Sequence, residues 1–141
     1  MTKILIAISV FLFVCSPFAN AEQVYYCASE LTTGFNKDKK TGEWERREFK
    51  VQRYTIKFND EYTKLDGLDE FGSWKCKKVY GGHEEFKNVR ICVPDLQSGM
   101  LFQFDYLTLR FLYSQTPVSG YLGNSHNADT NGIIAGTCQK F

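Results

Sequence analysis

The sequence predicts an all-β domain, a small antiparallel meander barrel or sandwich of about eight strands with two disulfides. Apolar and polar residues alternate along most of the chain, turn-forming residues bound each alternating run, and four cysteines follow a predicted N-terminal signal. Alternation of period two is typical of strands with one buried face and one solvent-exposed face. Many short strands separated by turns favour a sandwich or a closed barrel.

The N-terminal segment has the features of a cleavable secretory signal. Lys3 precedes an almost wholly apolar run from Ile4 to Val14, and Ala19-Asn20-Ala21 follows. This order of a basic residue, an apolar run and small residues is typical of a signal peptide. The apolar run is roughly a dozen residues, short of the about 20 that a membrane-spanning helix needs.

We therefore expect a signal peptide at residues 1–21 and a single mature domain at residues 22–141, with cleavage near Ala21-Glu22. This predicts a periplasmic or secreted protein without a membrane span. The alternative is a lipoprotein signal that uses Cys15, although Val14 stands where such sites have a small residue.

The mature chain carries 16 basic and 16 acidic residues, so its net charge is about zero. A balanced charge argues against nucleic acid or an anionic membrane as the partner, since both are found through long-range electrostatics. Five basic residues lie close together, and we expect them on the solvated face of a hairpin: Lys37, Lys39, Lys40, Arg46 and Arg47.

Four cysteines remain in the mature chain. An even number in a short exported chain predicts two disulfide bonds, for which three connectivities exist. Cys76 and Cys92 flank a Gly81-Gly82 turn region, whereas Cys27 and Cys138 lie near the two ends. We expect Cys76 to pair with Cys92 and Cys27 with Cys138. A metal site is the alternative, but the chain has no C-x-x-C motif and no histidine at ligand spacing from a cysteine.

The first predicted strands follow the alternation in order. Tyr54, Ile56 and Phe58 share one face of a strand whose other face carries Thr55 and Lys57, and Asn59-Asp60 supplies a turn. Other segments of the same kind are Val24 to Cys27, Trp44 to Phe49, Tyr62 to Leu65, Trp74 to Tyr80 and Val89 to Val93. Gly, Asn, Asp or Pro bounds each of them, as expected of strands.

The second half of the mature chain is more hydrophobic. Met100 to Phe104 and Thr108 to Tyr113 are either two strands joined by a turn at Asp105-Tyr106 or one long bent strand. A polar loop runs from Gly123 to Asn131, and a last strand is expected from Gly132 to Phe141.

The mature chain is rich in aromatic residues, with 19 of the 22 in the whole sequence. Aromatic side chains bury large areas and favour strands, so one interpretation is a core filled by them. The other is a barrel that holds a small apolar ligand. The residues expected to line such a pocket are Phe102, Phe104, Phe111, Tyr113 and Tyr121.

The sequence contains no recognisable catalytic motif, and it predicts neither a cofactor nor a metal site. A G-x-S-x-G elbow and an H-E-x-x-H helix are both absent. An enzyme would have to use one of two histidines, either His83 with Glu84 or Glu85, or His126 with Asp129. The catalytic interpretation therefore stays an alternative.

The mature chain resembles a group of small exported bacterial proteins of uncharacterised function. The matching segments are Tyr26-Cys27, Thr33-Gly34-Phe35, Arg53 to Phe58, and the C-terminal Gly136-Thr137-Cys138-Gln139-Lys140-Phe141, a G-T-C-x-K-F motif. The resemblance implies export and disulfide bonds but transfers no activity and no site.

A second resemblance is to the periplasmic lysozyme inhibitors of the small β-barrel type. They too begin with an aromatic-x-Cys strand behind a signal peptide, and Ser98-Gly99 is similar to their exposed serine loop. The chain departs from their later tryptophan and lysine-glycine motif, because Trp44 and Trp74 both lie earlier.

The sequence thus favours a non-enzymatic periplasmic or secreted binding module whose partner is a protein or a small apolar ligand. The alternatives are an inhibitor of a cell-wall hydrolase such as lysozyme, acting through a loop near Ser98 or His83, and an enzyme with a His-centred site.

Overall fold

The computed structural model describes residues 22–68, 72–79, 83–95, 99–116 and 130–141. The predicted signal peptide lies outside the described residues. The described chain forms nine strands: β1 (Gln23–Lys37), β2 (Trp44–Arg47), β3 (Arg53–Phe58), β4 (Lys64–Asp66), β5 (Trp74–Lys78), β6 (Val89–Pro94), β7 (Met100–Asp105), β8 (Arg110–Gln115) and β9 (Asn131–Lys140). A single 3-10 turn, Glu84–Phe86, precedes β6.

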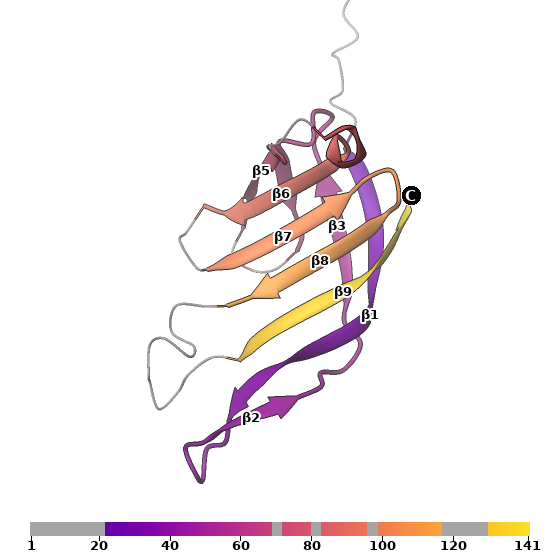
Figure 1. Cartoon of the computed structure of the whole chain (residues 1–141). Helices are drawn as coiled ribbons and strands as arrows, with labels where there is room; N and C mark the ends of the chain where they lie inside the picture. The colour runs from indigo at the N-terminus through magenta and orange to yellow at the C-terminus, as the bar shows by residue number, and fades with distance from the viewer. Residues whose placement is uncertain (1–21, 69–71, 80–82, 96–98, 117–129) are drawn as a thin grey trace, which may run out of the picture.

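Eight of these strands close into an antiparallel barrel, which confirms the predicted all-β class and decides between barrel and sandwich (Figure 1). Each strand from β3 to β9 pairs with the next along the chain, and β1 pairs with both β3 and β9. Closure leaves these strands without a long open edge, which protects a small β domain from pairing with other chains.

The ninth strand, β2, lies outside the ring on an extension of β1. β1 is 15 residues long, far longer than the predicted segment from Val24 to Cys27. Its first half pairs with β3, whereas Gly34 to Lys37 pair with β2. The second half of β1 and β2 therefore extend beyond β3, while β9 follows β1 as far as Phe35 (Figure 1). We call residues 31–52 the arm.

The barrel interior is filled by side chains that alternate with solvent-facing ones along each strand. Trp74, Phe102 and Phe104 are all completely buried. The Phe102 ring stacks on Phe111 at 5.6 Å between centroids and meets Tyr113 edge-on at 6.0 Å. These offset and edge-on contacts are the geometries that aromatic quadrupoles favour.

Both predicted disulfides are confirmed, and each joins residues directly opposite one another on neighbouring strands. Cys27 on β1 bonds to Cys138 on β9, and Cys76 on β5 bonds to Cys92 on β6. All four cysteines are buried in the core. The first bond ties the strands that close the barrel, and the two bonds are consistent with folding in an oxidising environment.

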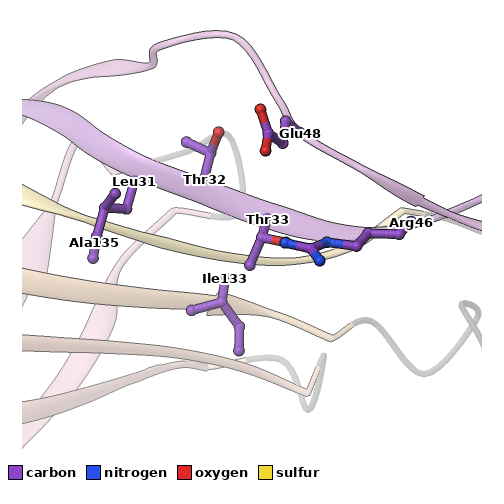
Figure 2. A pocket seen from close by; sticks show the side chains of 7 residues that line it. All are labelled: Leu31, Thr32, Thr33, Arg46, Glu48, Ile133 and Ala135. Carbon is purple, nitrogen blue, oxygen red and sulfur yellow. The ribbon is translucent and has the colours of Figure 1, made fainter.

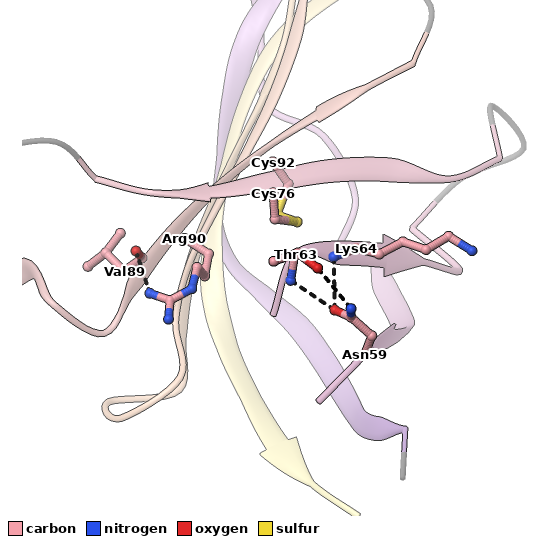
Figure 3. The surroundings of a disulfide bond; sticks show 7 residues. All are labelled: Asn59, Thr63, Lys64, Cys76, Val89, Arg90 and Cys92. Atoms are coloured by element: carbon pink, nitrogen blue, oxygen red, sulfur yellow. Dashed lines mark hydrogen bonds between the residues drawn. A yellow bond between two sulfur atoms is a disulfide. The ribbon is translucent and has the colours of Figure 1, made fainter. Parts of the chain in front are cut away.

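At one end of the barrel a buried arginine lies against a stacked pair of tyrosines, Tyr62 and Tyr106, whose ring centroids are 4.6 Å apart. Arg90 is only 5% exposed, and its guanidinium lies 4.9 Å from the ring centre of Tyr106 and 5.9 Å from that of Tyr62. Its Nη1 donates to the carbonyl oxygen of Lys87 at 3.0 Å and to that of Val89 at 3.1 Å, the second of which is drawn in Figure 3. Within the described chain no carboxylate pairs with it, so carbonyl dipoles and aromatic faces stabilise the charge.

Tyr62 is held in place by the turn between β3 and β4. Its φ of 54° is left-handed, a conformation that costs energy for a bulky residue. The Asn59 side chain holds this turn by accepting from the backbone N–H groups of Thr63 and Lys64 (Figure 3). The Tyr62 hydroxyl lies 2.6 Å from that of Tyr25, where burial, and then this hydrogen bond, raises the pKa of Tyr25.

Candidate binding surface

A bulge in β1 decides which side chains the arm presents to solvent. Ser29 pairs with Gly136 and Leu31 pairs with Ala135, so Glu30 is an extra residue without its own partner on β9. A β-bulge of this kind shifts the alternation of a strand by one residue. Even-numbered residues face outward before the bulge, and odd-numbered residues face outward after it.

The bulge brings together a set of outward side chains that we call the outer arm face. Its members come from three neighbouring strands: Leu31, Thr33 and Phe35 on β1, Arg46 on β2, and Ile133 and Ala135 on β9. Leu31 is 72% exposed, Phe35 54% and Ile133 49%. Neighbouring exposed apolar side chains on a water-facing sheet make this face a candidate for interaction.

Two adjoining hollows lie on the outer arm face. The first measures about 370 Å³ and extends from Leu31 and Ala135 to Arg46 and Glu48 (Figure 2). The second measures about 190 Å³ and lies between Phe35 and Ile133. Thr33, Arg46 and Ile133 line both hollows, so the two form one continuous surface.

Hydrogen bonds hold the segment after β2 against β1 and thereby fix the hollows. The Thr32 hydroxyl donates to the carbonyl oxygen of Phe49 at 2.6 Å and accepts from its backbone N–H at 3.1 Å. The backbone N–H of Gln52 donates to the Ser29 hydroxyl at 2.7 Å. Together with the backbone N–H of Ser29, which donates to the carbonyl oxygen of Gln52 at 2.9 Å, these bonds hold the segment between β2 and β3 on β1.

Gly34 allows the strands beneath the face to approach closely. A Cβ at this position would collide with the carbonyl oxygen of Asn131 and lie 2.8 Å from the Phe49 ring. The ring of Phe49 therefore lies over Gly34 and Gly132 on the side away from the outer arm face. The arm is packed on one side and exposed on the other.

The tip of the arm is an ordered turn. The backbone N–H groups of Thr41 and Lys40 donate to Asp38, at 2.9 and 2.7 Å, and these bonds hold the pKa of the Asp38 carboxyl below its usual value. On β2, Arg47 pairs with Glu45 at 3.0 Å. The predicted basic cluster therefore lies on a hairpin, as expected, and is divided between its two faces.

The residues predicted to line a ligand pocket lie inside the barrel, apart from one that the structure does not describe. Phe102, Phe104, Phe111 and Tyr113 are buried and contact one another through their rings. Tyr121 lies outside the described residues. Binding of a small apolar ligand at these residues remains a prediction.

Of the predicted catalytic and inhibitory residues, the structure describes His83, Glu84 and Glu85. His83 is exposed, and its ring lies 6.1 Å from that of Phe86. Ser98, His126 and Asp129 lie outside the described residues, so the enzyme and lysozyme-inhibitor alternatives remain predictions. Among the described residues no three His, Cys, Asp or Glu side chains are grouped as a metal site requires.

Within the described part of the chain, none of the helical segments has the length and apolarity to cross a bilayer.

Sequence reasoning missed the outer arm face, because the bulge that forms it interrupts the alternation. The sequence feature that could have indicated the face is the stretch from Leu31 to Lys37, which continues β1 well beyond the predicted strand from Val24 to Cys27.

Comparison with known proteins gives no family for this chain. No family model matches it, and no curated protein or solved structure matches it significantly.

Proposed function

We propose that the protein is a non-enzymatic periplasmic or secreted binding module that binds a protein partner through the outer arm face. The observation that carries this proposal is the exposure of Leu31, Phe35 and Ile133 side by side on a face held rigid from behind. Covering these side chains releases the water around them, which is the main driving force of protein association.

A protein partner suits the shape of this surface better than a small molecule does. Both hollows are open to solvent along the face, and their lining side chains come from neighbouring extended strands. Small molecules bind in concave sites that enclose most of their surface. A protein segment laid across the strands fills both hollows at once and covers the apolar side chains between them.

The disulfides and the predicted signal peptide support a site of action outside the cytoplasm. Two buried bonds hold the barrel in a single shape, so the arm is presented by a rigid base. Rigid presentation lowers the entropy lost on binding. The resemblance to small exported bacterial proteins agrees with this location.

Site-specific photo-crosslinking tests the proposal. The full chain, with its signal, is produced in its own host with p-benzoylphenylalanine in place of Leu31 and is irradiated in intact cells. The control carries the same group in place of Leu107, a leucine of equal exposure at 71% in the turn between β7 and β8.

We expect position 31 to give one defined protein adduct that position 107 does not give. The adduct must also disappear when Ile133→Glu is introduced beside position 31, since this change places a charge in both hollows. Identical adducts from both positions, or none from position 31, would overturn the proposal.

A further inference from the structure

We infer that the partner presents an acidic side chain next to an apolar one, with the carboxylate against Arg46 and the apolar group in the second hollow. This inference rests on the proposed function, because it uses the same face. It adds the chemistry of the segment that the face recognises.

The second hollow combines apolar walls with a single charge. Phe35 and Ile133 form its sides, and Arg46 is the only charged residue among those described that line it. The remaining lining residues are uncharged: Thr33, Gly34, Thr116, Asn131 and Gly132. Its volume of about 190 Å³ is suited to one large apolar side chain.

Arg46 is the one cation of β2 without a carboxylate of its own in the described chain. Its neighbour Arg47 faces the other side of the strand and pairs with Glu45. Glu48 lines the first hollow but not the second, and no ion pair joins it to Arg46. The planar guanidinium therefore remains available for two parallel hydrogen bonds to a carboxylate, the geometry that it favours.

The charge distribution of the chain also favours an acidic partner at the arm. Residues 31–52 carry six basic and four acidic side chains, a net charge of +2. The rest of residues 22–141 carries ten basic and twelve acidic side chains, a net charge of −2. The arm is therefore the positive end of a neutral molecule and attracts acidic segments during encounter.

Two of the four acidic side chains of the arm are engaged elsewhere, and neither Glu43 nor Glu48 forms an ion pair with Arg46 in the described chain. Asp38 accepts hydrogen bonds in the turn, and Glu45 is paired on the opposite face. On β1, the carboxylate of Glu30 accepts from the hydroxyl of Thr137 at 2.7 Å. None of these carboxylates pairs with Arg46, so a carboxylate of the partner would meet an unpaired guanidinium.

Selection from a phage-displayed library of random peptides tests this chemistry. The oxidised mature protein is the target, and the library is attached through its C-terminal end, so that side chains supply every carboxylate. We expect the enriched peptides to carry Asp or Glu within two positions of Leu, Ile, Phe or Trp. Replacing that acid by its amide should weaken binding about tenfold.

Reversing the charge of either of two adjacent arginines provides a matched control for the binding of the selected peptides. Arg46→Glu should weaken the selected peptides by at least about tenfold, with Arg46→Gln intermediate, whereas Arg47→Glu should change binding less than about twofold. Equal effects of Arg46→Glu and Arg47→Glu, or enriched peptides without acidic residues, would overturn the inference.

The outcome also separates this inference from the proposed function. If Leu31→Glu and Ile133→Glu abolish peptide binding while Arg46→Glu does not, the face binds a partner but not through a carboxylate. If none of the three variants affects the selected peptides, they bind elsewhere and the proposed face fails as well.

Discussion

Cys27 and Cys138 face each other across the seam where the first and last strands of the barrel pair, with their Cα atoms 3.9 Å apart. This seam has ten residue pairs, and the paired residues are between 96 and 115 positions apart in the sequence. Ordering so distant a contact costs chain entropy, and the disulfide lowers that cost by restricting the unfolded chain.

We predict that losing the seam disulfide destabilises the protein more than losing the other one. The sequence separations are 111 and 16 residues, and the loop-entropy relation then makes the double variant Cys27→Ala/Cys138→Ala less stable than Cys76→Ala/Cys92→Ala by about 1.7 kcal/mol. Urea unfolding of both variants checks this. Equal stabilities, or the reverse order, would show that strain or packing, and not loop length, determines how much each disulfide contributes to the free energy of unfolding.

The sequence was informative about strands and cysteines because both depend on local patterns. Period-two alternation placed the strands from β3 to β9 near their observed positions, and the turn at Asp105-Tyr106 proved to separate β7 from β8. Cys76 and Cys92 were predictable as hairpin neighbours, since β5 and β6 are consecutive strands.

The arm was not predictable for a physical reason. Alternation identifies the buried face only while its phase is constant, and the bulge at Glu30 reverses that phase within β1. The sequence also gave no sign that Arg90 is buried, because its inward position depends on rings from Tyr62 and Tyr106, which are distant in the chain. Both features depend on tertiary contacts.

Two glycines of β9 should respond differently to an added methyl group. A Cβ at Gly136 would collide with the backbone carbonyl of Ala28 and lie 2.8 Å from the Phe111 ring. At Gly132 the nearest atom is in the Phe49 ring, at 3.3 Å, and a side chain can move. We expect Gly136→Ala to cost about 3 kcal/mol and Gly132→Ala under about 1 kcal/mol in urea unfolding. Similar costs would contradict the close approach of β1 and β9.

Arg90 should stabilise the barrel end despite its buried charge. Replacement by Met keeps the apolar stem but removes both aromatic contacts and leaves the carbonyl oxygens of Lys87 and Val89 without this donor. We expect Arg90→Met to cost about 2 kcal/mol and Arg110→Met, on an exposed position of β8, to cost almost nothing.

A double-mutant cycle separates the aromatic contribution of Arg90 from its hydrogen bonds. Combined with Tyr106→Leu, Arg90→Met should show a coupling free energy of about 1 kcal/mol. Additive effects of the two changes would mean that Arg90 contributes through the carbonyl groups alone.

Stability should fall in acid partly through Asp66. The Ser73 hydroxyl, which donates to Asp66 at 2.7 Å, and then the Lys64 ammonium hold the pKa of this carboxyl below its ordinary value of 3.8. A lowered folded pKa means that the contribution is present above the unfolded pKa and is lost as the pH falls through the folded one. Asp66→Asn should therefore flatten the pH dependence of unfolding below about pH 4. Parallel curves for wild type and Asp66→Asn would contradict this.

Native mass spectrometry on the oxidised protein from a periplasmic extract of its own host tests the binding function most directly. Leu31→Glu and Leu107→Glu are prepared alongside the wild type, because the two leucines are equally exposed and only the first lies on the outer arm face. We predict a complex with a protein partner for the wild type and Leu107→Glu, and the bare chain with two disulfides for Leu31→Glu. A small-molecule adduct that all three proteins retain, or a bare chain in every case, would contradict binding of a protein at the arm.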